Sequence, residues 1–184
     1  TTPKENTPIT CPLDPDTMYG ITKRAMELLG VYYKKTKDLD FRSLRYPGVI
    51  SHETPPGGGT TDYAIDIFYK AIKQGHYTCF LEKQTSLPMM LMEDCLDATV
   101  RFIQAEPEEL SQRPIYNITS LSFTPQELAA QIKKHQPNFR VQYSPDYRQK
   151  IADTWPASID DSEFRKDLGW QPKFGSIDSL TKVM

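Results

Sequence analysis

The stretch Met18-Tyr-Gly-Ile-Thr-Lys-Arg-Ala-Met-Glu-Leu-Leu29, followed by Phe41-Arg-Ser-Leu-Arg-Tyr-Pro-Gly-Val-Ile50, decides the fold class. Asp14-Pro-Asp-Thr17 offers a helix N-cap, and the spacing of the apolar residues after it predicts a helix to about residue 37. Residues 40–50 predict a strand that ends in a Pro-Gly turn. A strand directly after a long helix is typical of a parallel α/β sheet. The apolar face of the helix would carry Ile21, Ala25, Leu28, Leu29 and Tyr32.

The rest of the chain continues the alternation of helices and strands. The first 16 residues, rich in proline, predict an exposed loop, and residues 51–59 a second loop. Strands are expected at 77–81, 87–92, 116–119 and 141–143, and helices from Thr60-Thr-Asp62 to Gly75, at 93–106, after Thr124-Pro-Gln-Glu127, at 147–153, at 162–168 and from Ser176. The helix before Gly75 would point Ala64, Ile67, Phe68, Ala71 and Ile72 inward. These elements predict one α/β unit without internal repeats.

Composition excludes several classes of protein. The 184 residues are 38% hydrophobic and 25% charged, which favours a packed core over disorder. A net charge of −2 without a basic run argues against nucleic acid as a partner. The longest apolar stretch, residues 87–92, is far shorter than the roughly 20 residues that span a bilayer, and no secretion signal is visible. We therefore expect no membrane contact, no secretion, and free thiols at Cys11, Cys79 and Cys95.

Histidines and paired carboxylates offer little evidence for other chemistry. His52, His76 and His135 lack metal-ligand spacing, so they are expected at the surface and no metal site is predicted. Asp160-Asp161 resembles a catalytic pair, but Asp161 or Ser162 more simply caps the helix that follows. Asn117-Ile-Thr119 fits a glycosylation pattern inside a predicted strand, where we expect it to be silent.

Tyr19 and Lys23 form the most informative pair. Residues four apart on a helix lie on one face, so the two side chains are predicted to be neighbours. A phenol is a poor base at neutral pH, and a nearby ammonium favours its phenolate form by Coulomb attraction. The ammonium also keeps donors for the hydroxyl groups of a ligand. Taken alone, the spacing is common on helix surfaces, so the pair gains meaning only from the strand and the glycine-rich loop that follow.

In that context the sequence resembles the extended short-chain dehydrogenase/reductase family, also described as the NAD-dependent epimerase/dehydratase family. The resemblance rests on Tyr19-x-x-x-Lys23, Arg45-Tyr-Pro-Gly48 and Pro88-Met-Met-Leu-Met-Glu-Asp94. Residues 44–51, 56–64, 122–125 and 148–161 are similar to the branch of this family that oxidises L-threonine. The similarity extends over essentially the whole chain.

The resemblance implies a fold. The chain would be the C-terminal part of a Rossmann-like, parallel-sheet NAD-binding fold with a small α/β substrate-binding region. Residues 1–80 would belong to the dinucleotide-binding domain and include a substrate loop at 51–62. Residues 81–184 would mix elements that close that domain with the substrate-binding region, and the 184 residues together would form one incomplete unit.

The resemblance also implies roles for individual residues. Tyr19 would take a proton from the substrate hydroxyl, and Lys23 would bind the nicotinamide ribose. The alternatives are that Thr60 is only an N-cap, a role compatible with binding, and that Trp155 packs in a core. The implied cofactor-binding residues are Tyr19, Lys23, Tyr46, Pro47, Gly48 and Ile50, and the implied substrate-binding residues are Tyr19, Gly59, Thr60, Thr61 and Trp155. The segment Gly57-Gly-Gly-Thr-Thr61, as the start of a helix, would offer free N–H groups to a substrate carboxylate.

Two parts of the family's machinery are missing from the sequence. No Gly-x-x-Gly-x-x-Gly follows a strand, and the family's catalytic Ser or Thr would precede Thr1, since Thr1 and Thr2 match the loop after it. We therefore expect a fragment, inactive alone, of an NAD-dependent homodimer that converts L-threonine to 2-amino-3-oxobutanoate. It would be cytoplasmic in a bacterium and mitochondrial in an animal. The alternatives are a nucleotide-sugar epimerase or dehydratase of the same family, and an inactive relic.

Overall fold

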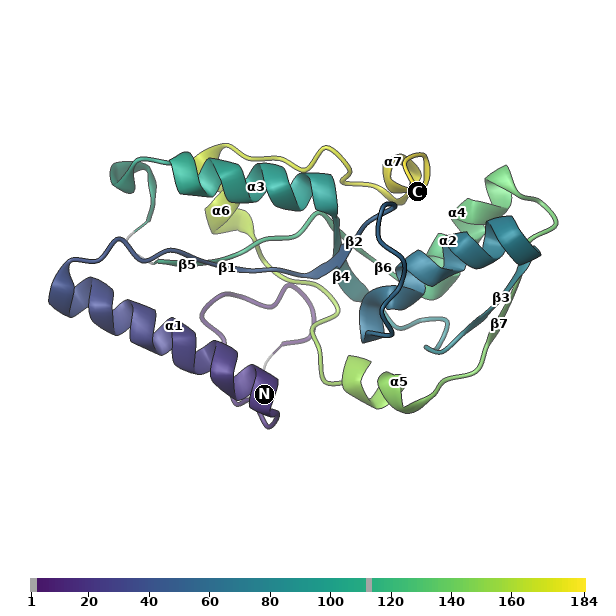
Figure 1. Cartoon of the computed structure of the whole chain (residues 1–184), viewed down its shortest axis with the longest axis horizontal. Helices are drawn as coiled ribbons and strands as arrows, with labels where there is room; N and C mark the ends of the chain where they lie inside the picture. Colours follow the sequence, from purple (N-terminus) through teal and green to yellow (C-terminus); the bar gives the residue numbers. More distant parts are fainter. Residues whose placement is uncertain (1–2, 112–113) are drawn as a thin grey trace.

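The computed structural model describes residues 3–111 and 114–184, and Figure 1 shows their arrangement. Strand pairing is mainly parallel. β1 pairs with β5, β2 with β4, and β3 with β7 in parallel, whereas β6 pairs with β4 antiparallel. The strands are β1 (Ser43–Arg45), β2 (Gly48–Ile50), β3 (His76–Cys79), β4 (Leu87–Leu91), β5 (Ile115–Asn117), β6 (Leu121–Phe123) and β7 (Arg140–Tyr143). The predicted α/β class is confirmed.

The predicted strand at residues 40–50 is in fact two short strands. β1 ends at Arg45 and pairs with β5, whereas β2 starts at Gly48 and pairs with β4. Tyr46 and Pro47 separate them. Proline has no N–H to donate to a ladder, so the chain changes its pairing partner at this point. The break leaves Tyr46 and Pro47 outside the strands, at the carboxyl end of β1.

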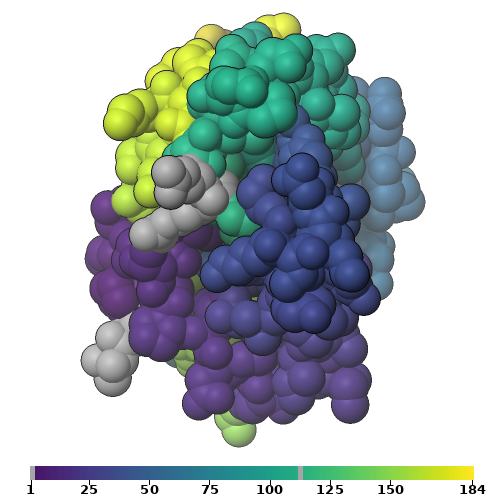
Figure 2. All heavy atoms as spheres, turned by 90° about the vertical axis from the view of Figure 1, so that its left-hand side faces the viewer, coloured from purple at the N-terminus to yellow at the C-terminus, as the bar shows by residue number. Residues whose placement is uncertain are grey.

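Helices lie on both sides of β1 and β5: α1 (Met18–Lys37) on one side, and α3 (Met92–Gln104) with α6 (Ser162–Leu168) on the other (Figure 1). Figure 2 looks onto the end of the molecule where the connection from α1 to β1 (indigo) lies beside the end of α3 (teal). Arg42 joins them, since its Nη1 donates to the carbonyls of Phe102 at 2.6 Å and Ala105 at 2.8 Å. The last turn of α3 therefore receives a cation, as helix C-termini favour.

The N-cap of α1 is Thr17, whose hydroxyl accepts from the Gly20 N–H at 3.1 Å. Gly30 is buried because the Phe41 ring covers it so closely that a Cβ would lie 2.2 Å from ring carbon. The rest of the helix packs little within the described residues. Its predicted apolar face is about half exposed at Ile21, Leu28, Leu29 and Tyr32.

The main core packs the strands β2, β3, β4 and β6 against the helices α2 (Tyr63–Gln74), α4 (Pro125–His135) and α7 (Ile177–Thr181). Ala64, Ile67, Phe68 and Ala71 point into it as predicted. The prediction for Ile72 is wrong: its side chain is exposed, because the buried part of α2 ends at Ala71. The capping box at Thr124 is confirmed, with Glu127 N–H donating to the Thr124 hydroxyl at 3.2 Å.

The N-terminal loop makes backbone contacts with a distant segment that the sequence does not predict. Thr7 is 4% exposed and forms a parallel bridge with Ile159. Its N–H donates to Ser158 O at 3.0 Å, and its carbonyl accepts from Asp160 N–H at 3.0 Å. The expectation of a fully exposed loop is therefore wrong at this residue, because a distant segment offers backbone partners.

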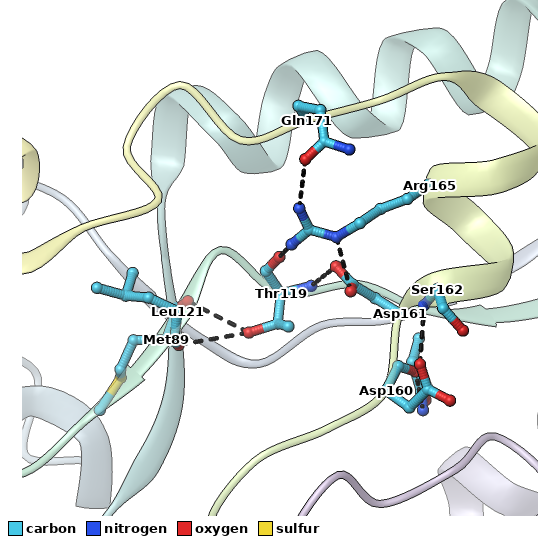
Figure 3. A network of polar contacts seen from close by, with 9 residues as sticks. Met89, Thr119, Leu121, Asp160, Asp161, Ser162, Arg165 and Gln171 are labelled. Carbon is cyan, nitrogen blue, oxygen red and sulfur yellow. Dashed lines mark hydrogen bonds and ion pairs between the residues drawn. The ribbon is translucent and has the colours of Figure 1, made fainter.

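Asp160 and Asp161 belong to a network of polar contacts that ties residues 160–171 to Thr119 (Figure 3). Arg165 donates to Asp161 Oδ1 at 2.8 Å, to Thr119 O at 3.0 Å and to Gln171 Oε1 at 2.8 Å. Asp161 stands at the N-cap of α6, but it is the Asp160 carboxylate that accepts the Ser162 N–H, at 2.9 Å. The two aspartates therefore have structural roles. The predicted N-cap position of Asp161 is confirmed, but the side chain that accepts the backbone N–H is that of Asp160.

The remaining described elements are α5 (Tyr147–Ala152) and two 3₁₀ turns at Thr60–Asp62 and Pro107–Glu109. Among the described residues, no helix combines the length and apolarity needed to cross a membrane. Cys79 and Cys95 are buried free thiols and Cys11 is a half-buried one.

Candidate active site

A cavity of about 420 Å³ brings together six of the residues that the sequence singles out. We name it the Tyr19–Trp155 pocket. Its size suits a small molecule. It lies at the carboxyl end of β1, where open α/β sheets bind their ligands. The six residues are Tyr19, Tyr46, Pro47, Gly48, Thr61 and Trp155.

Tyr19 and Lys23 are neighbours on the first turns of α1. The Lys23 Nζ lies 5.5 Å from the centroid of the Tyr19 ring, as the four-residue spacing predicts. Tyr19 is 73% exposed, so its hydroxyl is accessible to a ligand within the described part of the chain. Lys23 is exposed and does not line the pocket itself. The pair therefore combines a phenol that lines the pocket with a cation that contacts the phenol ring outside the pocket lining.

The wall formed by Tyr46, Pro47 and Gly48 is held at both ends. The Tyr46 hydroxyl lies 2.8 Å from Thr99 Oγ1, which in turn donates to a carbonyl of α3. A Cβ on Gly48 would lie 2.6 Å from Met89 Sδ and 2.6 Å from Thr61 Cγ2. Only glycine therefore fits between the core and the pocket at this position.

Ile50 is placed differently from the other cofactor residues of the prediction. Its side chain has 0% exposure and belongs to the main core. It does not line the Tyr19–Trp155 pocket. Any contact of Ile50 with a ligand would thus have to use its backbone.

The glycine-rich loop does not offer the free N–H groups that the sequence predicts. Gly57, Gly58 and Gly59 all donate their N–H to Asp62 Oδ2, at 2.6, 2.7 and 2.9 Å. The prediction of an open carboxylate site is therefore wrong for these three groups, because a carboxylate of the same chain already accepts from them.

The three residues predicted for substrate in this loop are separated by the fold. Thr61 lines the pocket, whereas Gly59 and Thr60 do not. Thr60 is 8% exposed, and the N-cap of the 3₁₀ turn is Gly59 rather than Thr60. Trp155 is 39% exposed and lines the pocket, which decides between the two interpretations of that residue in favour of a pocket wall.

Several lining residues carry no signal in the sequence. Thr7, Pro8 and Ile159 reach the pocket because the N-terminal segment pairs with residues 158–160. Asn117 also lines it, and its Nδ2 donates to Asp160 O at 3.1 Å. Arg45 and Pro88 could have been inferred, because each belongs to a motif that the sequence shows.

Within the described ranges no group of three or more His, Cys, Asp or Glu side chains is arranged to hold a metal ion. The three histidines are exposed, as the sequence predicts. The polar groups that line the Tyr19–Trp155 pocket include the Tyr19 phenol, the Thr61 hydroxyl and the Trp155 indole.

Residues 1–119 match the model of the NAD dependent epimerase/dehydratase family. The chain belongs to this family. Its Tyr19-x-x-x-Lys23 pair and the Tyr46–Gly48 wall both lie inside the matched range.

Several similar proteins are threonine dehydrogenases. The mitochondrial L-threonine 3-dehydrogenase of Bos taurus is 49% identical over 185 residues, which cover 100% of this chain and 49% of that protein. The crystal structure of L-threonine dehydrogenase from Phytophthora infestans is 56% identical, with a TM-score of 0.95 over 99% of this chain and 59% of that one. The holo form of a GalE-like L-threonine dehydrogenase from Cupriavidus necator is 47% identical with a TM-score of 0.94, over 100% of this chain and 59% of that chain. The chain spans about half the length of the curated relatives it matches.

Proposed function

We propose that this chain forms the substrate side of an NAD-dependent enzyme that oxidises the 3-hydroxyl of L-threonine to give 2-amino-3-oxobutanoate. The observation that carries the proposal is the shared pocket: Tyr19 and Thr61 line one cavity beside the Tyr46–Gly48 wall. The relatives named above support the choice of substrate. By the full-length enzyme we mean a chain of the relatives' length that carries these 184 residues, and the activity is proposed for that chain.

Tyr19 acts as the base in this proposal. Its exposed hydroxyl takes the proton of the substrate hydroxyl, and the Lys23 ammonium stands beside it, 5.5 Å from the centroid of the Tyr19 ring. NAD, when bound, supplies the acceptor for the hydride that leaves C3 of threonine. The residues that would hold its nicotinamide end are Lys23, Tyr46, Pro47 and Gly48. The lining fits this role, because Tyr46, Pro47 and Gly48 face one cavity together with Tyr19.

Thr61 and Trp155 are the residues we assign to the amino acid. The Thr61 hydroxyl can donate to or accept from its polar groups. Trp155 limits access of water and offers a ring face to an ammonium. Gly59 and Thr60 act indirectly, because they hold Thr61 in place without lining the pocket.

The test is turnover by the purified full-length enzyme, followed as NADH formation. We expect NADH with L-threonine and much less with L-serine, which lacks the methyl group. UDP-glucose serves as a second substrate class. Conversion of UDP-glucose without net NADH would favour a nucleotide-sugar epimerase instead. Tight NAD binding with no turnover of either compound would favour an inactive relic.

The proposal extends to the assembly of the enzyme, its location and its division into parts. We propose a homodimer that packs through the half-exposed apolar face of α1. Most apolar residues of α2 are instead buried in the core of the same chain. The bovine relative is called mitochondrial, and we propose that location for an animal source and the cytoplasm for a bacterial one. Residues 1–80 and 81–184 are proposed as the dinucleotide-binding part and the mixed closing and substrate-binding part. Strand pairs such as β2 with β4 join the two ranges into one unit.

A further inference from the structure

Asp62 makes an unusual set of contacts for an acidic residue beside a proposed carboxylate site. A single oxygen, Oδ2, accepts the N–H groups of three consecutive residues, Gly57, Gly58 and Gly59, at 2.6, 2.7 and 2.9 Å. Gly58 has a φ of +98°, a conformation that residues with a side chain rarely adopt. The glycines thus wrap their donors around one carboxylate oxygen.

The same loop is also held from its other side. Arg148 Nη1 lies 3.5 Å from the Gly58 carbonyl. The guanidinium is fixed by Asp146, at 2.6 Å for Nη2, and it stacks on Phe80 with its carbon 3.2 Å from the ring centroid. Gly58 therefore has its N–H bound by Asp62 and its carbonyl facing α5.

This arrangement determines where Thr61 stands. Asp62 and Thr61 are adjacent in the 3₁₀ turn Thr60–Asp62, and the Thr61 methyl packs in the space that the missing Gly48 side chain leaves. The turn is also held by its own backbone, since Asp62 N–H donates to Gly59 O at 3.2 Å, and by the buried start of α2 at Tyr63. The Asp62 carboxylate adds to these contacts by fixing the glycines that precede Thr61. We call the three hydrogen bonds from Gly57, Gly58 and Gly59 to the Asp62 carboxylate the Asp62 brace. The brace holds the loop before Thr61, which lines the pocket that faces the proposed substrate.

We infer that Asp62 is a positioning residue for the amino-acid substrate: its carboxylate ties the three glycine N–H groups and so holds Thr61 at the pocket wall. This inference rests on the proposed function. It also implies that these N–H groups do not bind the substrate carboxylate, because they are already bound to Asp62. Hydrogen bonds to a charged acceptor are stronger than those to a neutral one, so the carboxylate should hold the loop better than an amide would.

The kinetic test compares three variants of the full-length enzyme. Asp62→Ala removes every acceptor, and we expect the KM for L-threonine to rise about tenfold or more with the KM for NAD unchanged and kcat within about threefold. Asp62→Asn keeps one amide oxygen as an acceptor and should recover much of the loss. Glu53→Ala removes a carboxylate of the same loop region that is 82% exposed, and it should leave both KM values unchanged.

A second measurement does not depend on activity. Hydrogen exchange followed by mass spectrometry on peptides that cover residues 51–62 reports directly on the three glycine amides. We expect slow exchange in the wild type and exchange at least about tenfold faster in Asp62→Ala, confined to this segment. Equal exchange in the two proteins would overturn the brace.

The outcomes separate the two proposals. An unchanged threonine KM in Asp62→Ala, or a loss in kcat alone, would overturn the positioning role while wild-type turnover of threonine kept the proposed function intact. A wild-type enzyme that does not oxidise threonine would overturn the proposed function and, with it, the substrate role of Asp62. Hydrogen exchange would still decide whether the brace exists.

Discussion

Glu27 on α1 and Arg45 at the end of β1 form a two-pronged ion pair: Nε donates to Oε1 at 2.6 Å and Nη2 donates to Oε2 at 2.8 Å. Only 12% of the Glu27 side chain and 23% of the Arg45 side chain are exposed. The pair joins the helix that carries Tyr19 and Lys23 to the strand that leads into Tyr46. It therefore fixes the distance between the proposed base and the proposed nicotinamide wall.

The first prediction concerns this pair. Burial by itself raises the pKa of Glu27, but the hydrogen bonds and charges of Arg45 and Arg24 outweigh it and hold the pKa below its ordinary value of 4.5. A carboxyl with a lowered pKa stabilises the fold above its unfolded pKa, and that contribution is lost as the pH falls through the folded pKa. Glu27→Gln should lower the free energy of unfolding by about 1–3 kcal/mol at neutral pH.

Urea unfolding of the full-length enzyme at neutral and acidic pH measures this effect. The difference between wild type and Glu27→Gln should shrink as the pH falls below 4.5. Lys182→Gln is the control, because its ion pair with Asp178 is 63% and 56% exposed, and it should lower the stability less than Glu27→Gln does. A difference for Glu27→Gln that does not vary with pH would contradict the assignment.

The second prediction concerns the base. Tyr19→Phe keeps the ring but removes the hydroxyl, so kcat should fall by about 10²-fold or more with little change in the KM for threonine. Steady-state kinetics of the full-length enzyme measures both constants. Tyr33→Phe, on the same helix but away from the pocket lining, should turn over normally. Near-normal turnover in Tyr19→Phe would mean that another group is the base.

The third prediction concerns the loop threonines. Thr61→Val keeps the shape of the side chain and removes the hydroxyl that lines the pocket, so the KM for L-threonine should rise about tenfold or more. Thr60→Val should have a smaller effect, because Thr60 is buried outside the lining. If Thr61→Val changed the KM for NAD in place of that for threonine, the loop would belong to the cofactor.

The fourth prediction concerns Gly48. Its Cβ in Gly48→Ala would meet Met89 Sδ and Thr61 Cγ2 at 2.6 Å, and such overpacking costs about 1–3 kcal/mol. We expect lower stability together with weaker threonine binding, measured by thermal unfolding and by KM. Gly57→Ala is the steric control for stability, since its nearest neighbour would be Asp62 Oδ2 at 3.7 Å. Equal stability of the two variants would show that the wall at Gly48 yields easily.

Much of the fold could be predicted because its signals are local. The capping box of Thr124 and Glu127 uses backbone groups within one helical turn, and the sequence shows both partners. The Tyr19 and Lys23 pair likewise follows from helical spacing alone. β6 was not predicted, because this short strand depends on β4 as a partner rather than on its own pattern.

The sequence by itself determined the α/β class, the helix starts, and the placement of Tyr19 beside Lys23, since each depends on residues a few positions apart. Only the tertiary structure decided which residues share the pocket. Thr61 and Trp155 join Tyr19 there, and the Ile50 side chain points into the core. Asp62 accepts the glycine N–H groups that the sequence predicts to be free. The physical reason is that a buried side chain or backbone donor pairs with whichever group folding brings close to it. The spacing of residues along the sequence reveals neither that distance nor which groups compete for the same partner.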